Sequence, residues 1–174
     1  MRRAGALSQA LVVVLVAAAC GGEHAGTVPP GAIARVGDRA IPRAAFDAEL
    51  ARSRRAYAAR GQQFPKAGTA AYRRLRDSVV DLLVDRARLE LAARRARVSV
   101  TPAQVDARLR ALVRRSFGGD PQRFREQLRR TGTTEAEVRA AIRYELLAGA
   151  LRGAPPPSPP DVTYAPGFEP TGGG

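Results

Sequence analysis

The segment from Thr69 to about Arg97 constrains the fold most, because its apolar residues recur at the spacing of one helix face. Thr69 belongs to the residue types that cap helix N-termini. At about 1.5 Å per residue, such a helix would be about 40 Å long and would cross a whole small domain. The apolar stripe consists of Tyr72, Leu75, Val79, Leu82, Leu83, Leu89 and Leu91. The sequence therefore predicts a mainly α fold around one long central helix.

Four further helices are predicted from their start and stop signals, which are capping residues or prolines in front and mostly glycines behind. The segments Thr101–Gln104 and Thr134–Glu137 have the capping-box pattern, in which a threonine is followed three residues later by Gln or Glu. The four helices are expected over residues 42–60, 101–117, 120–131 and 134–152. With the long helix, this makes five.

Short strands are predicted near both ends of the domain. In Ile33–Val36, apolar and polar residues alternate loosely, which indicates a strand. Gly37–Arg39 is typical of a turn, and Ala40–Ile41 is expected to form a short returning strand. A proline-rich run, 155–160, can carry the chain about 20 Å at about 3.1 Å per residue. We expect the following Val162–Tyr164 to pair with Ile33–Val36, because an isolated strand leaves its backbone groups unpaired. A disordered tail is the competing interpretation.

The first twenty residues have the layout of a secretory signal. Arg2 and Arg3 precede the apolar run Leu11–Val16, which ends in Ala17–Cys20. This run is shorter than the roughly 20 residues that span a bilayer. The expected organisation is a signal peptide over 1–19, a tether over 20–31, a helical domain over 32–152 and a Pro/Gly-rich tail over 153–174.

The signal resembles that of bacterial lipoproteins, in which the cysteine at the cleavage site is lipidated and becomes the first residue. Cys20 stands at that position and is the only cysteine. The resemblance implies a lipid on Cys20 and a protein anchored at the outer face of the cytoplasmic membrane or in the periplasm. Ala17–Ala19 also suits an ordinary signal peptidase, and an uncleaved anchor helix is a third interpretation. All three place the working part outside the cytoplasm.

The composition is strongly basic, with 29 Lys and Arg against 16 Asp and Glu. A basic surface can bind nucleic acid, but an exported chain meets little of it, so we expect no nucleic-acid partner. Anionic lipid headgroups and cell-wall polymers are the favoured partners of such a surface. One cysteine excludes an intrachain disulfide. With His24 as the only histidine, a His/Cys metal cluster is excluded too, and no cofactor is expected.

Five segments share their order and spacing with one family. They are Ile33–Phe46, Leu82–Glu90, Val98–Val105, Phe117–Asp120 and Thr134–Arg139. In these segments the chain resembles the N-terminal chaperone domain of the SurA family, which includes PrsA-like exported lipoproteins. The resemblance covers about residues 33–152. It implies an exported chaperone.

Members of that family typically carry a parvulin-type prolyl isomerase domain after the last of these helices. Here about twenty residues follow Arg152, and parvulin sites use histidines, whereas His24 is the only one in the chain. We therefore expect a member that lacks the isomerase domain. It has no candidate catalytic residue, and we predict that it is not an enzyme.

Binding remains as the function. A chaperone needs exposed apolar surface with charge around it, and the aromatic residues around the first interhelical loop, Tyr57, Phe64 and Tyr72, are the candidate client-binding residues. The competing interpretation is that they close the core beneath that loop. The sequence thus predicts a membrane-anchored extracytoplasmic chaperone-like domain that binds unfolded or exported polypeptides. The alternative is a structural or accessory lipoprotein that scaffolds an envelope protein complex.

Overall fold

The computed structural model of the chain describes residues 27–152 and 160–171. The predicted signal peptide, the predicted lipidation site Cys20 and most of the proline run 155–160 lie outside the described residues. Within them, no helix combines the length and the hydropathy that a membrane span requires.

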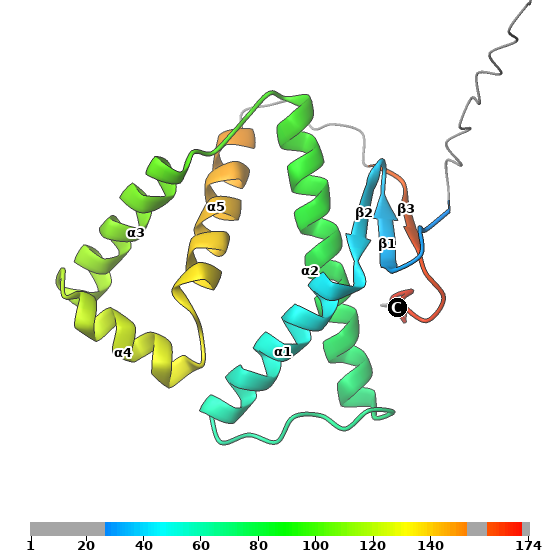
Figure 1. Cartoon of the computed structure of the whole chain (residues 1–174), viewed down its shortest axis with the longest axis horizontal. Coiled ribbons are helices and arrows are strands. Elements are labelled where there is room, and N and C mark those ends of the chain that lie inside the picture. The colour runs from blue at the N-terminus through cyan, green and yellow to red at the C-terminus, as the bar shows by residue number, and fades with distance from the viewer. Residues whose placement is uncertain (1–26, 153–159, 172–174) are drawn as a thin grey trace, which may run out of the picture.

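The described residues form five helices and a three-stranded antiparallel sheet, so the predicted mainly α class is confirmed (Figure 1). Helix α2 is the longest and lies at the centre, with the sheet on one side of it and α5 on the other. The strands are β1 (Ala32–Val36), β2 (Arg39–Pro42) and β3 (Val162–Tyr164). The helices are α1 (Arg43–Ala59), α2 (Ala70–Arg95), α3 (Pro102–Phe117), α4 (Pro121–Thr131) and α5 (Glu135–Leu151).

The helix starts follow the local chemistry of the sequence. The Thr69 side chain accepts a hydrogen bond from the Tyr72 backbone N–H at the start of α2. Thr101 and Thr134 form complete capping boxes, in which the Gln or Glu three residues later bonds back to the threonine N–H. Because each cap satisfies backbone donors that the helix leaves free, it fixes where the helix begins.

The sheet has the order β2-β1-β3, which confirms the predicted pairing of the two chain ends. Ala34 lies opposite Tyr164, and Val36 lies opposite Val162. β1 is therefore the central strand, and its residues Ile33, Ala34 and Val36 are fully buried. The Tyr164 ring packs against the core next to β1, and burial raises the pKa of its hydroxyl above the ordinary value.

Two hydrophobic cores hold the domain together. The first lies between the sheet, α1 and α2, and includes Ile33, Phe46 and Val80. The second lies between α3, α4 and α5, and includes Leu109 and Phe124. The two halves meet where α5 packs on α2 and where the end of α4 reaches α1.

The predicted apolar stripe of α2 includes both Leu82 and Leu83, but the structure buries the two residues to different extents. Leu83 is buried in the first core, at 8% exposure, but Leu82 is only half-buried and does not belong to it. The residues of α2 buried in the first core, which include Val79, Val80, Leu83, Val84 and Ala87, recur at helical spacing on one face. Leu82, about 100° around the helix from Leu83, lies outside this face.

Candidate functional site

The three aromatic residues singled out in the sequence form one cluster. Tyr57 lies near the end of α1, Phe64 lies in the loop, and Tyr72 lies at the start of α2. The ring centroids of Tyr57 and Phe64 are 5.6 Å apart, and those of Phe64 and Tyr72 are 6.3 Å apart, both edge to face. Such geometry stabilises aromatic pairs beyond simple area burial. All three side chains are half-buried.

Two arginines cover part of this cluster. The Arg54 guanidinium lies 5.0 Å from the Phe64 ring centroid, and that of Arg60 lies 5.3 Å from the Tyr57 centroid. Phe64 also packs against the first core. It therefore helps to close the core beneath the loop, while a part of each ring stays open to solvent. The client-binding role of the cluster stays a prediction.

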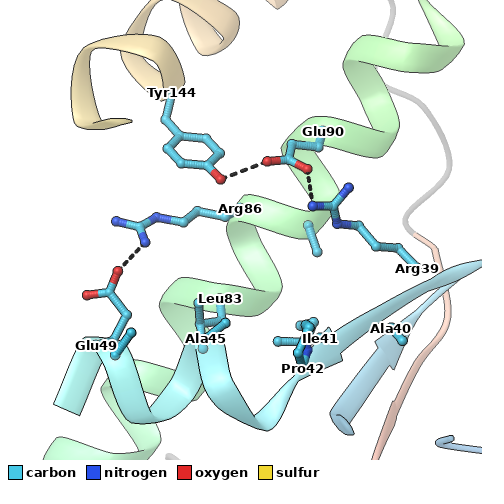
Figure 2. Close-up of a pocket in the computed structure, with 12 residues that line it drawn as sticks. Arg39, Ala40, Ile41, Pro42, Ala45, Glu49, Leu83, Arg86, Glu90 and Tyr144 are labelled. Atoms are coloured by element: carbon cyan, nitrogen blue, oxygen red, sulfur yellow. Dashed lines mark hydrogen bonds and ion pairs between the residues drawn. The ribbon is translucent and has the colours of Figure 1, made fainter. Parts of the chain in front are cut away.

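A second candidate site is a hollow of about 300 Å³ between β2, α1, α2 and α5 (Figure 2). Sequence reasoning did not find it. Its floor is apolar and includes Ile41 and the small residues Ala45 and Ala87. Its volume is at the lower end of the range for ligand pockets. Alanine side chains on the facing sides of α1 and α2 leave this space open.

The rim of the hollow is a network of charged side chains that joins four elements (Figure 2). The Tyr144 hydroxyl of α5 donates a hydrogen bond of 2.7 Å to Glu90 of α2. Arg39 of β2 pairs with the same carboxylate at 2.5 Å. Arg86 of α2 pairs with Glu49 of α1, and its guanidinium lies 5.0 Å from the Tyr144 ring centroid. The rim therefore fixes α1, β2 and α5 to α2.

These contacts set the charge state of the rim. Burial alone would raise the pKa of Glu49, but hydrogen bonds from Arg86 and Arg52 outweigh it and hold the pKa below its ordinary value. Burial, followed by the hydrogen bond to Glu90, raises the pKa of Tyr144. Glu49 is therefore an ionised carboxylate engaged by arginines, and Tyr144 keeps its proton. This arrangement suits binding, because neither group is poised to exchange a proton near neutral pH.

The hollow also borders a free sheet edge. Among the described residues, β2 is an edge strand that pairs with β1 alone, and Arg39, Ala40 and Pro42 are among the residues that line the hollow. An unpaired strand edge can accept an extended peptide by backbone hydrogen bonds. Pro42 has no N–H, so the edge that can pair is short.

No group of three or more His, Cys, Asp or Glu side chains in the described part of the chain is arranged to hold a metal ion. The chain was also compared with known proteins. The sequence model of the SurA-like N-terminal domain matches residues 2–152. The chain belongs to this family. Searches of curated proteins and of solved structures found no match.

Membership of the SurA-like family indicates a chaperone-like role, with polypeptides as clients and a location outside the cytoplasm. Both candidate sites lie within the matched residues. The strand β3 and the tail around Phe168 lie beyond them, yet they complete the sheet and pack on the first core. The SurA-like domain of this chain therefore uses ten further residues, 162–171, as part of its fold.

Proposed function

We propose that this SurA-like protein is an extracytoplasmic chaperone that binds unfolded or exported polypeptides without isomerase catalysis. The observation that carries the proposal is the hollow beside β2, in which a free strand edge adjoins an apolar, alanine-rich floor. An extended polypeptide needs both features. Its backbone can pair with the edge of β2, and one apolar side chain can enter the hollow.

The charged rim fits a client of mixed sequence. Its carboxylates are already paired with Arg39 and Arg86, so a bound chain leaves no buried charge without a partner. The guanidinium groups keep the surface around the floor hydrated, and the hollow therefore binds apolar segments without becoming a site of self-association.

The aromatic cluster supplies a second apolar contact on the same pair of helices. Tyr57 and Tyr72 flank Phe64, and Arg54 and Arg60 lie above the rings. Aromatic rings accept many side chains of different shape, which suits a binder of unfolded chains. In this proposal, the hollow holds the extended backbone and the cluster holds apolar side chains elsewhere along the client.

The test compares two tryptophan variants of α1 in an assay of client aggregation. Ala48 lines the hollow and Ala51 does not, and both are exposed on α1. Ala48→Trp fills the hollow and should abolish the protection of an unfolded client from aggregation, whereas Ala51→Trp should leave it unchanged. Equal protection by both variants would place binding elsewhere. The double variant Tyr57→Ala/Tyr72→Ala reports separately on the aromatic cluster.

The alternative function, an accessory lipoprotein of an envelope complex, has a different signature. If this alternative holds, the protein should not protect unfolded clients from aggregation. One stoichiometric partner should instead be recovered with the native protein. A direct assay of Xaa-Pro isomerisation on a peptide tests the absence of catalysis. Clear catalysis that survives His24→Ala would contradict that part of the proposal.

The proposal includes a lipid anchor on Cys20. A single acyl chain gives only marginal membrane binding, so stable anchoring takes a diacylglycerol group or more. The intact mass of the native mature protein should equal that of a chain that begins at Cys20 and carries this group. Cys20→Ala should release the protein from the membrane fraction. A native mature protein with an unmodified Cys20 thiol would refute the anchor and leave client binding untouched.

A further inference from the structure

A separate hollow of about 360 Å³ lies between α3, α4 and the start of α5. It shares no lining residue with the hollow beside β2. Its floor is formed by Leu109, Val113 and Phe124. Leu109 and Phe124 are buried members of the second core, and Val113 packs against it. The floor is thus an apolar surface held in place by the core itself.

Two arginines stand at the rim of this hollow. Arg110 and Arg114 lie one turn apart on α3, and both are exposed. Among the described residues, neither guanidinium has an ion-pair or hydrogen-bond partner. The acidic residue at the rim, Glu135, is already bonded to Arg139 at 2.9 Å. The rim therefore presents two free positive charges above an apolar floor.

The backbone around this hollow is helical rather than extended. Seven of its eight lining residues lie in helices, Gly119 lies in a turn, and none of the eight lies in a strand. At the start of α4, Asp120 accepts the N–H groups of Gln122 and Arg123, and Pro121 has none. An extended peptide thus finds no strand edge here, in contrast to β2. A hydrocarbon chain needs no backbone partner.

From this combination we propose that the hollow between α3, α4 and α5 binds an anionic phospholipid of a bilayer. The acyl chain lies on Leu109, Val113 and Phe124, and the phosphate lies between Arg110 and Arg114. Guanidinium groups bind phosphate through paired, charge-assisted hydrogen bonds. The chain as a whole carries a formal net charge of +13, of which Arg2 and Arg3 of the predicted signal peptide supply two. The positive charge that remains after residue 19 attracts the protein to an anionic membrane surface. This lipid contact is independent of client binding and of the anchor on Cys20.

The first experiment measures sedimentation of the protein with vesicles. One set is made of equal parts phosphatidylglycerol and phosphatidylcholine, and the other of phosphatidylcholine alone. We expect binding to the anionic vesicles, and a loss of about thirtyfold in affinity for Arg110→Gln/Arg114→Gln. The matched control is Arg74→Gln/Arg95→Gln, which removes two exposed arginines of α2 that lie outside this hollow. All variants carry the same N-terminal segment, so differences report on the removed charges.

The second experiment identifies the ligand chemistry by amide chemical shifts. Soluble dihexanoyl phosphatidylglycerol should shift Val113 and Gly119, whereas glycerol phosphate without acyl chains should shift them far less. Two outcomes would overturn the proposal. One is an equal loss of vesicle binding in the control variant, which indicates general charge attraction. The other is stronger binding at Val113 and Gly119 by an acidic, leucine-containing peptide than by the lipid, which assigns the hollow to a polypeptide.

Discussion

The Phe168 ring, in the C-terminal tail, packs edge to face on Phe46 of α1, with centroids 5.2 Å apart and planes at 89°. The Arg43 guanidinium lies 5.1 Å from the same Phe168 centroid. The tail is held further by Arg76, which donates to the Gly167 carbonyl at 2.9 Å. The C-terminal segment thus covers the first core, and the stability of that core should depend on the Phe168 ring.

Phe168→Ala should destabilise the domain by about 2 kcal/mol, less than for a fully buried ring, because Phe168 is half-buried. In a domain of this size the expected drop in melting temperature is about 4–8 °C. Hydrogen exchange should also speed up at the amides of β3. Phe168→Leu keeps apolar volume but loses the edge-to-face ring contact, so its stability should lie between those of the wild type and Phe168→Ala. Unchanged exchange in β3 would mean that the strand holds without the ring.

The two leucines in the middle of α2 provide a matched pair. Leu83→Ala opens a cavity in the first core, and such truncations cost about 2–5 kcal/mol. Leu82→Ala removes the same atoms from a half-buried position and should cost about 1 kcal/mol or less. Urea unfolding of the two variants measures the difference. Equal losses of unfolding free energy in the two variants would mean that Leu82 contributes to a hydrophobic core as much as Leu83 does.

The helix starts and the strand pairing could be predicted because their causes are local or obligatory. Thr101 and Thr134 cap their helices through residues three positions away, so the signal lies within one short segment. The pairing of β3 with β1 followed from the need of a strand for a partner. The choice between Leu82 and Leu83 depends on how α1 and the sheet pack on α2, and an apolar stripe this wide does not decide it.

The hollow beside β2 could not be predicted, because its residues are scattered. Arg39, Ala45, Ala87 and Tyr144 come from four elements and meet only because β2, α1 and α5 all pack on α2. Alanine on a helix is also the residue with the best helix propensity, so Ala45 and Ala87 carry no distinct signal of a cavity. The aromatic cluster was found because its three residues lie in or beside one loop.

Glu49 should make stability depend on pH in a defined direction. Its pKa in the folded protein lies below the ordinary value of 4.5, so the stabilisation is fully present above that value and is lost as the pH falls through the folded pKa. The difference in stability between wild type and Glu49→Gln should be constant near neutral pH and shrink below about pH 4. Asp47→Asn, an exposed change on the same helix, controls for the loss of one negative charge. A difference that stays flat down to pH 2 would contradict the ion pairs of Glu49 with Arg86 and Arg52.

Two glycines test how closely the halves of the domain meet. Gly118 ends α3 and Gly132 ends α4, and both have a φ of +64°, which a residue with a Cβ adopts at a cost of about 1–2 kcal/mol. At Gly118, a Cβ would meet nothing within 4 Å, so Gly118→Ala should show the backbone cost alone. At Gly132, a Cβ would lie 2.8 Å from the Arg55 carbonyl oxygen of α1, so Gly132→Ala must also push α4 away from α1.

We therefore expect Gly132→Ala to destabilise the protein by clearly more than Gly118→Ala, measured by urea unfolding of both variants. Arg55 of α1 also donates to the Gly132 carbonyl and pairs with Glu137 of α5. Displacing α4 should therefore weaken the contact of α1 with α4, which joins the two halves in addition to the packing of α5 on α2. Hydrogen exchange at the end of α1 should rise in Gly132→Ala and stay unchanged in Gly118→Ala. Equal effects of the two variants on both measurements would show that the end of α4 has room to move, and that α5 alone joins the two halves.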